Sequence, residues 1–478
     1  MLLILLILIP LLAGVILFFA PKLVAKSLAL VASLATLISC IFLFPDVKST
    51  GGIEFQQAWL PQYGMNFLLE MKILGFLMCL LTALVFTILI ISIWNKEQQN
   101  ESRFFGLMLL SMSGLMGVFL ANDAFLFYIF WEFALIPVYF LCSTYGDENK
   151  IKVSIKFFIY TLLGSLLMLV GIMYLYQQMP VPSFAWQSMA STGANLPIGT
   201  QAIIFALFFI AFAIKMPLFP FHTWQPDTYE SVATPVTVIL SALMVKMGLF
   251  AVYHWLLPLF PNAALGHVNI VLALCVIGIL YASFLAIVQT NIKRLIAYSS
   301  IAHVGLMCAA MFAHNENLVG VQGAILQMFN HGINILGLWI LVSIIEKRIN
   351  TLNLNEMGGI AKIAPNFTFA LVLITLANIA LPLTNSFAGE FLMFNGLFTA
   401  QSKYAILFTV LAGLSIILAA IYSLQMIKKV AYGELKPSTE NFTDLTWNEK
   451  IALYSIIAMI LILGFFPNLI LNLIQVKG

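Results

Sequence analysis

The sequence predicts an all-α protein that crosses a membrane many times. Of its 478 residues, 62% are apolar and only 9% are charged, whereas soluble domains carry about 25% charged residues. One crossing takes roughly 20 apolar residues, so the chain has room for about a dozen or more spans and for little else. The net charge of +3 is small and argues against nucleic acid as a partner, which leaves the lipid bilayer as the main surrounding.

Apolar runs that are separated by charged residues, prolines, glycines and asparagines predict 14 transmembrane helices. These expected helices span residues 2–20, 23–44, 72–94, 104–121, 124–144, 154–177, 201–229, 232–257, 268–290, 294–313, 318–345, 365–401, 404–427 and 448–473. The first has no basic segment before it and no small-residue cleavage site after it, so it is interpreted as a span rather than a signal peptide.

Basic residues predict the orientation of these helices. They gather in every second loop, while the other side holds only Lys48, Lys72, Lys403 and Lys477. Because basic loops stay in the cytoplasm, we expect a bacterial inner membrane protein with both termini on the periplasmic side.

Two of the expected helices are interrupted. The seventh carries three prolines between residues 217 and 226, and the twelfth breaks at LPLTNSFAGE, residues 381–390. Interrupted spans in corresponding halves are typical of transporter binding sites. The two spans are five crossings apart, so they run in opposite directions, as two inverted five-helix repeats (helices 4–8 and 9–13) would require.

This pattern divides the chain into four parts. Helices 1–3 occupy residues 1–103, and the first repeat occupies residues 104–257. The second repeat occupies residues 258–430, and a cytoplasmic loop with helix 14 occupies residues 431–478.

Four charged residues fall inside apolar spans: Glu132, Lys215, Lys246 and Glu390. Such a group costs roughly 2.5–3.5 kcal/mol at the bilayer centre, so it usually faces a partner or water and marks an ion pathway. The structural alternatives are a neutral, packed carboxylic acid for Glu132, a structural ion pair for either lysine, and a carboxylate held by the free amides of a half-helix for Glu390.

Two histidines lie in the same region of the sequence. His303 in SSIAHVG is interpreted as a proton relay, because imidazole gains and loses protons near neutral pH. His331 in LQMFNHGINILG is either a relay or one partner of an interhelical hydrogen bond. The six histidines show no metal-binding spacing, and the five cysteines stand singly in apolar runs, which argues against iron–sulfur sites and disulfides.

The motifs WEFALIPVYFL, AFAIKMPLFPFHTWQPDTYE, SSIAHVG, LQMFNHGINILG and LPLTNSFAGEFLMFNG resemble the antiporter-like subunits of respiratory complex I, in the same order through helices 4–13. Within that family the chain is most similar to the M-type subunits of bacterial proton-pumping NADH:quinone oxidoreductase, which are related to Mrp-type antiporter subunits. Glu390 stands where L- and N-type subunits typically carry lysine, and no long lateral helix follows helix 14. The chain departs from the family pattern at Leu383, usually glycine, and at Asn66, commonly aspartate.

The resemblance implies a role for each buried group. Glu132 and Lys215 would form the pair of helices 5 and 7, and Lys246 would connect this pair to the central relay at His303. Glu390 would be the terminal site.

The resemblance also implies a redox-driven complex. No GxGxxG fingerprint or cluster-ligand cysteine motif occurs in the chain, so FMN, iron–sulfur clusters and quinone are expected in partner subunits and no cofactor is expected here. The expected neighbours are the L-type and N-type subunits. Alternatives are a subunit of an Mrp-type cation/proton antiporter or of a membrane-bound hydrogenase, and a non-conducting scaffold.

Overall fold

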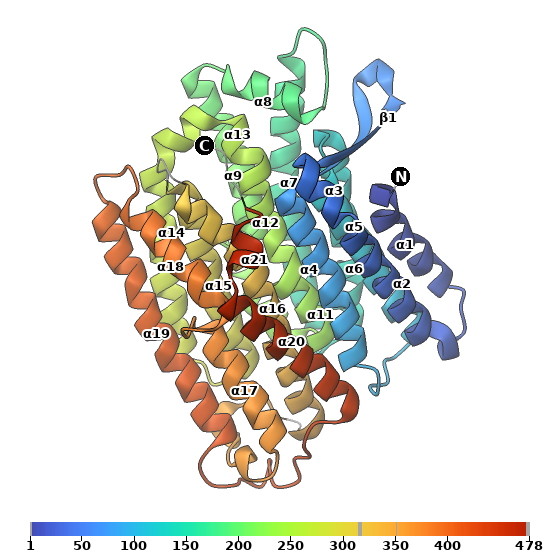
Figure 1. The fold of residues 1–478 in the computed structure, drawn as a ribbon, viewed down its shortest axis with the longest axis vertical. Helices are drawn as coiled ribbons and strands as arrows, with labels where there is room; N and C mark the ends of the chain where they lie inside the picture. The colour runs from blue at the N-terminus through green and yellow to red at the C-terminus, as the bar shows by residue number, and fades with distance from the viewer. Residues whose placement is uncertain (1, 314–317, 350, 475–478) are drawn as a thin grey trace.

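The chain folds into a bundle of long helices, seen in a computed structural model that describes residues 2–313, 318–349 and 351–474 (Figure 1). Lys477, one of the residues used to predict orientation, lies outside this part. The first half contains α1 (Leu2–Leu17), α2 (Lys22–Phe42), α3 (Phe44–Thr50), α4 (Ile73–Ser92), α5 (Glu101–Leu120), α6 (Ala124–Thr144), α7 (Lys150–Gln177), α8 (Trp186–Ala194), α9 (Ile198–Lys215) and α10 (Trp224–Ser231).

The second half begins with a helix in five pieces, α11 (Thr234–Ile239), η2 (Leu240–Met244), α12 (Val245–Ala251), η3 (Val252–Leu256) and α13 (Leu257–Leu259). It continues with α14 (Pro261–Val288), α15 (Ile292–Phe312), α16 (Val319–Ile349), α17 (Pro365–Asn378), α18 (Asn385–Phe398), α19 (Ala405–Ala431), α20 (Trp447–Phe465) and α21 (Asn468–Leu471). Short 3-10 turns are η1 (Pro61–Tyr63), η4 (Leu354–Glu356) and η5 (Ile360–Lys362).

Most of these helices can cross a membrane. Within the described residues, 12 are long and apolar enough for a crossing, and Leu2–Leu17 and Pro365–Asn378 are shorter apolar helices. The protein is therefore a mostly helical, polytopic membrane protein.

Burial separates central helices from peripheral ones. The apolar windows of α15 and α16 are 100% and 94% buried within the chain, whereas those of α2 and α19 are only 33% and 28% buried. In Figure 1, α2 and α19 lie towards opposite sides of the bundle, with α12 and α16 between them. Charged side chains on the central helices are thus shielded by protein, while the outer helices present apolar side chains to lipid or to neighbouring subunits.

Both interruptions predicted from proline are present. The seventh expected helix stops at Lys215 and resumes at Trp224, and the twelfth stops at Asn378 and resumes at Asn385. In the second interruption Leu383 has φ 73°, a left-handed conformation that costs a non-glycine residue roughly 1–2 kcal/mol. This conformation explains why glycine suits that position in the family pattern.

The eighth expected helix is not a uniform α-helix. It contains two π-helical turns, Leu240–Met244 and Val252–Leu256, on either side of the short segment that holds Lys246. A π-turn leaves backbone groups outside the regular ladder and often occurs at functional sites. Apolar periodicity cannot reveal such a turn, because one extra residue per turn barely changes the hydrophobic pattern.

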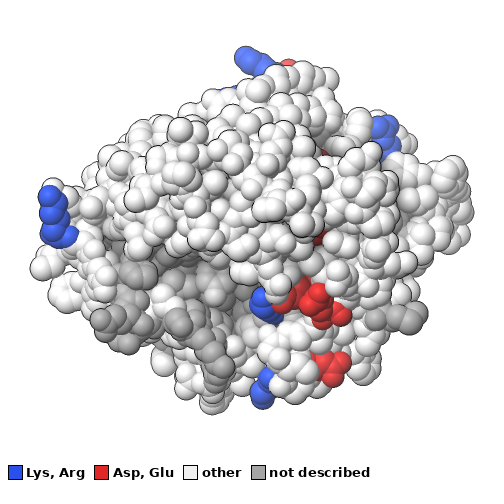
Figure 2. Space-filling model, turned by 90° about the horizontal axis from the view of Figure 1, so that it is seen from above, with Lys and Arg blue, Asp and Glu red and all other residues white. Residues whose placement is uncertain are grey.

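The all-α expectation is wrong at one end of the bundle. Strands β1 (Ile53–Leu60) and β2 (Met65–Met71) form an antiparallel hairpin with Ile53 opposite Met71 and an irregularity near Ala58. These strands are shorter than a membrane-spanning helix, so apolar runs of helical length do not reveal them. Figure 2 views the molecule from the hairpin end and shows a mostly uncharged surface with a few separate Lys and Arg residues.

Candidate functional site

Lys246 lies at the centre of the buried polar groups. Lys246 is 0% exposed. Its Nζ donates to the Ser241 carbonyl oxygen at 3.0 Å and shares a hydrogen bond of 2.9 Å with His331 Nδ1. Ser241 belongs to the π-helical turn η2, so the irregular turn presents a carbonyl oxygen to the lysine of the following helical segment.

The contacts continue from α16 to α15 and α18. The imidazole centroids of His331 and His303 are 5.4 Å apart, and His303 Nδ1 lies 3.3 Å from Glu390 Oε1. Lys246, His331, His303 and Glu390 thus form one row across four helical elements, which we call the relay row. Neither imidazole Nε2 has a hydrogen-bond partner within the described residues.

The structure places His331 within this row, while the choice between the two roles that the sequence left open stays a prediction. His331 lies between Lys246 and His303 and contacts both. The sequence shows a histidine within an apolar span, but not which helix faces it.

Glu390 lies farther into its helix than the sequence suggested. It is in the second turn of α18, while Asn385 is the first residue of that helix. The free amides of a helix are confined to its first turn, so they are not the groups that hold this carboxylate. The side chain that meets it is His303, with Nδ1 3.3 Å from Oε1.

Glu132 and Lys215 lie on α6 and α9, two helices that contact each other through aromatic side chains. Lys215 Nζ is 5.4 Å from the centre of the ring of Trp131, the residue next to Glu132 in α6. No hydrogen bond reaches Lys215 Nζ or Glu132 Oε1 within the described residues. Trp131 also packs on Phe212 of α9, with ring centroids 5.6 Å apart. The structure therefore places Lys215 beside the neighbour of Glu132 without an ion pair between the two residues, and their pairing stays a prediction.

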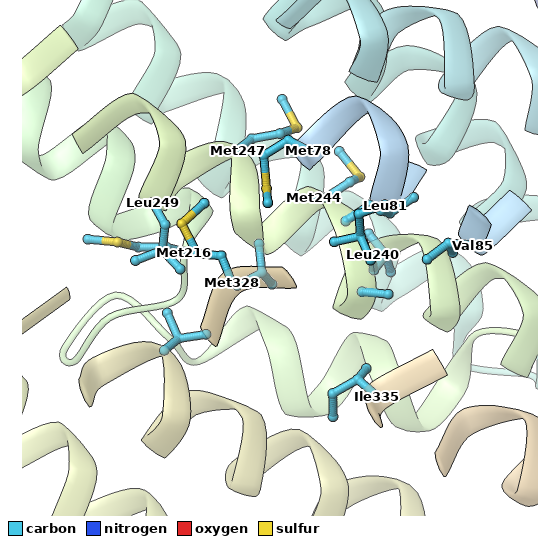
Figure 3. Packing of buried hydrophobic residues seen from close by; sticks show 14 of the residues in the cluster. Met78, Leu81, Val85, Met216, Leu240, Met244, Met247, Leu249, Met328 and Ile335 are labelled. Atoms are coloured by element: carbon cyan, nitrogen blue, oxygen red, sulfur yellow. The ribbon is translucent and has the colours of Figure 1, made fainter. Parts of the chain in front are cut away.

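The pair and the relay row are joined through close backbone packing. A Cβ on Gly248 of α12 would lie 2.7 Å from Met216 Cβ, directly after Lys215. Figure 3 shows methionines from several elements in this region, including Met78, Met216 and Met328. Methionine is flexible and polarisable, so this apolar packing can adjust when a neighbouring charge moves.

Amide side chains hold the second interruption against α16. Asn330 Nδ2 donates to the Asn385 carbonyl oxygen at 2.6 Å, and Asn334 Nδ2 donates to Ser386 Oγ at 2.9 Å. Gly389 leaves room for Gln327, because a Cβ there would lie 2.7 Å from Gln327 Oε1. These contacts fix the start of α18 and hence the position of Glu390.

A small cavity adjoins the end of the relay row. Its volume is about 20 Å³, and His303, Glu390, Ser415 and Tyr422 contribute to its walls. A space of roughly 10–15 Å³ holds one water molecule. The cavity is therefore large enough to give Glu390 one water-sized neighbour.

The sequence did not predict the buried ion pair of Lys293 and Glu346. Lys293 is only 2% exposed and pairs with Glu346 at 2.7 Å, and Glu346 also accepts from Thr234 Oγ1 at 2.7 Å. Both charges lie near helix ends, where the sequence indicates solvated groups. Their burial depends on how α11, α15 and α16 meet, which apolar runs do not specify.

No metal centre is evident among the residues the structure describes, since no three His, Cys, Asp or Glu side chains gather in them as a metal site requires. The groups that do gather are a basic amine, two imidazoles and a carboxylate, all of which bind and release protons.

A helical bundle with two interrupted helices and ionisable groups in its interior has the architecture of an ion-translocating membrane protein. Residues 121–424 match the family described as "NADH:quinone oxidoreductase/Mrp antiporter, TM". This match covers more than half of the chain, and the chain belongs to that family.

Individual relatives show which members of this family the chain is similar to. It is 34% identical over 463 residues to NADH-quinone oxidoreductase subunit M of Rhodobacter capsulatus, covering 94% of this chain and 89% of that protein. It is 33% identical over 431 residues to subunit M of Escherichia coli K12, covering 88% and 83%.

Solved structures agree on the fold. A chain of respiratory complex I from Thermus thermophilus with bound NADH matches with a TM-score of 0.90 and 28% identity, covering 99% of this chain and 98% of that one. A chain of the Mrp complex from Dietzia sp. DQ12-45-1b matches with a TM-score of 0.88, covering 98% and 95%. Its identity is 19%, so this second match bears on the fold alone.

Proposed function

We propose that this chain is the proton-translocating, M-type membrane subunit of an NADH:quinone oxidoreductase, and that protons pass along its buried polar groups. The relay row carries the proposal. Lys246, His331, His303 and Glu390 follow one another across the bundle, with a hydrogen bond of 2.9 Å at one end and a contact of 3.3 Å at the other. A scaffold has no need for such a row, because each buried ionisable group costs folding free energy.

Glu132 and Lys215 form the switch in this proposal. Burial disfavours the charged ammonium of Lys215, whereas an approaching Glu132 carboxylate favours it. Movement of Glu132 towards Lys215 therefore loads a proton, and movement away releases it. The absence of a bond to either Lys215 Nζ or Glu132 Oε1 within the described residues is consistent with a pair that can open and close.

The released proton passes to Lys246, then along the relay row to Glu390, and leaves from there. The energy comes from electron transfer in partner subunits, which hold FMN, the iron–sulfur clusters and quinone. The chain itself carries no redox centre in this proposal. L-type and N-type subunits are its neighbours in the membrane.

The same proposal assigns topology. The 12 long helices, α1 and the interrupted pair α17 and α18 make 14 crossings, with both termini on the periplasmic side of the bacterial inner membrane. Helices α5–α13 and α14–α19 form the two inverted repeats. In support, α6 meets the interrupted α9 through Trp131 and Phe212, and α15 meets the half-helix α18 through His303 and Glu390.

Replacement of Lys246 by methionine tests the relay row, because methionine has similar length and no titratable group. We expect Lys246→Met to leave the complex assembled and to lower strongly the number of protons pumped per NADH oxidised in inverted membrane vesicles. Lys403→Met changes a residue outside the buried groups and should pump like the wild type. A normal proton-to-electron ratio in Lys246→Met would overturn the proposed route.

Replacement of either member of the switch should have a related effect. We expect Lys215→Ala and Glu132→Ala to assemble but to pump weakly, since either change removes the alternation between loaded and released states. Wild-type pumping by both variants would remove the pair from the mechanism.

Purification of the native complex decides between this function and an Mrp-type antiporter or membrane-bound hydrogenase. Copurification with NADH-oxidising and iron–sulfur subunits is expected. Copurification with antiporter subunits, together with cation/proton exchange that needs no NADH, would establish the alternative.

A further inference from the structure

The cavity beside Glu390 brings together oxygen-bearing side chains that have no role in the function described above. Its volume is about 20 Å³, and the hydroxyl-bearing residues Ser283 of α14, Ser415 of α19 and Tyr422 of α19 contribute to its walls. α15 and α19 each pack against the other helices around it, and Figure 1 shows α14, α15, α18 and α19 together towards one side of the bundle. We call Glu390, Ser283, Ser415 and Tyr422 the oxygen cluster.

The hydroxyl of Ser283 lacks a partner. Ser283 is 0% exposed, and no hydrogen bond reaches its Oγ in the part of the chain that the structure describes. A buried serine in a helix can donate to a carbonyl oxygen of the preceding turn, as Ser111 does to Met108 at 2.7 Å. An unsatisfied buried polar group costs about 1–3 kcal/mol, so this open hydroxyl at the cavity wall indicates a ligand.

The other oxygen atoms of the cluster are available as acceptors. Ser415 Oγ donates its hydrogen to the Ala412 carbonyl oxygen at 2.6 Å, which leaves its lone pairs free. The Tyr422 hydroxyl shares a hydrogen bond of 2.9 Å with Ser299 Oγ. The half-helix α17 ends beside the cavity, where its C-cap Ile379 is one of the wall residues. Because the C-terminal end of a helix carries partial negative charge, the surroundings of the cavity favour a cation.

Charge and size define the class of ligand. Among the described wall residues Glu390 is the carboxylate, and none is Lys or Arg. His303 also lines the cavity, and its imidazole does not oppose a cation while it is neutral. One carboxylate balances one positive charge, whereas a divalent ion would leave uncompensated charge in a buried site. The cavity has room for about one water-sized particle, so the ion would bind without its hydration shell.

We propose that the oxygen cluster binds a small monovalent metal cation, such as sodium, directly on the Glu390 carboxylate. The carboxylate supplies the charge, Ser283 and Ser415 supply neutral oxygen ligands, and the end of α17 contributes its dipole. Ends of interrupted helices bind cations in this way in transporters. Such a hard ion takes oxygen ligands, so the site needs none of the His and Cys clusters that hold transition metals. The site shares Glu390 with the relay row, but cation binding does not depend on proton transfer along that row.

Binding of radiolabelled sodium ions to the purified complex tests the site. The measurement is made at one fixed pH, and choline chloride keeps the ionic strength constant because choline is too large for the cavity. Ser283→Ala removes a hydroxyl that has no protein partner, so we expect assembled complex of normal thermal stability that binds sodium several-fold more weakly. Ser415→Ala should weaken binding in the same way. Glu390→Gln removes the charge and should abolish the saturable binding at this site.

Matched controls separate the loss of a ligand from the loss of any hydroxyl. Ser111→Ala removes a buried hydroxyl of α5, and Ser455→Ala removes one that, like Ser415, bonds to a carbonyl oxygen of its own helix. Both should bind sodium like the wild type. Ser283→Cys keeps the size of the side chain but replaces a hard oxygen by a soft sulfur, and it should weaken binding. All other chains of the complex are the same in these variants, so the differences report on this site.

The outcomes distinguish this inference from the proposed function. Equal sodium binding by the wild type and by the variants of the oxygen cluster overturns the cation site, whereas weak pumping by Lys246→Met still supports the relay row. Normal pumping by Lys246→Met overturns the relay row, whereas sodium binding that only the variants of the oxygen cluster weaken still establishes the cation site.

Discussion

At the scale of single residues, the buried charges were visible in the sequence, but the side chains that contact Lys246 were not. A charged residue inside an apolar run stands out by its cost, so Glu132, Lys215, Lys246 and Glu390 could be found without a structure. Pairing depends on which helix faces which, and neighbouring residues do not encode that. The contact of 2.9 Å between Lys246 and His331 is the clearest example.

His331 provides a prediction at this scale. His331→Leu removes the imidazole that Lys246 contacts and that adjoins His303, so a proton on the lysine loses its next acceptor. We expect assembled complex with strongly reduced pumping, measured as protons moved per NADH oxidised. His267 bonds instead to a carbonyl oxygen of its own helix, Ala263 at 2.8 Å, and His267→Leu should retain pumping. Equal pumping by the two variants would contradict a relay role for His331.

Glu390 permits a test of chemistry rather than of shape. Glu390→Gln keeps the size and hydrogen bonding of the side chain but cannot titrate, so we expect reduced pumping. Glu390→Lys should retain more activity, because a lysine beside the His303 imidazole would reproduce the arrangement of Lys246 with His331. Pumping in vesicles with the same content of complex compares the two, and wild-type activity in the glutamine variant would make Glu390 structural.

At the scale of helices, prolines predicted both interruptions correctly, because a proline removes a backbone donor and clashes with the preceding turn. The π-helical turns around Lys246 could not be predicted in this way. They depend on packing, such as the close approach of Gly248 to Met216, and they leave no distinct hydrophobic period. The sequence therefore located the helix ends that frame the site, but not the irregular turn that holds Lys246.

The second interruption depends on a close contact with α20. A Cβ on Gly464 would lie 2.1 Å from the carbonyl oxygen of Leu383, and Leu383 already has a left-handed backbone. Gly464→Ala must therefore displace the segment before α18, and we expect lower thermal stability of the purified complex and weaker pumping. Gly413, inside α19, has no atom within 4 Å of such a Cβ.

Gly413→Ala is the matched control for this change. Alanine favours a helix over glycine by about 1 kcal/mol, so the control should be as stable as the wild type or slightly more stable. Similar melting temperatures for the two alanine variants would show that the interruption tolerates movement of α20.

At the scale of the whole molecule, hydropathy gave the membrane class and the order of the long helices, because an apolar run of roughly 20 residues matches the thickness of the bilayer core. It did not give the burial of each helix. The windows of α15 and α19 are both apolar, yet the first is 100% and the second 28% buried. That difference follows from position in the bundle, and Lys246, His303 and His331 lie on the central, protein-surrounded helices.

Orientation is the last property at this scale, and it rests on the distribution of basic residues rather than on packing. Because basic loops are retained in the cytoplasm, the loop between α19 and α20 should be cytoplasmic and the segment around α8 should be periplasmic. Cysteines introduced at Glu440 and Ser191, both exposed in the chain, report on the two sides. The native cysteines that the structure describes are all buried, so replacing them by serine or alanine gives a clean background. In intact cells an impermeant thiol reagent should label Ser191→Cys and spare Glu440→Cys until the membrane is opened. Labelling of Glu440→Cys in intact cells at the level of Ser191→Cys would reverse the orientation or change the number of crossings between the two positions.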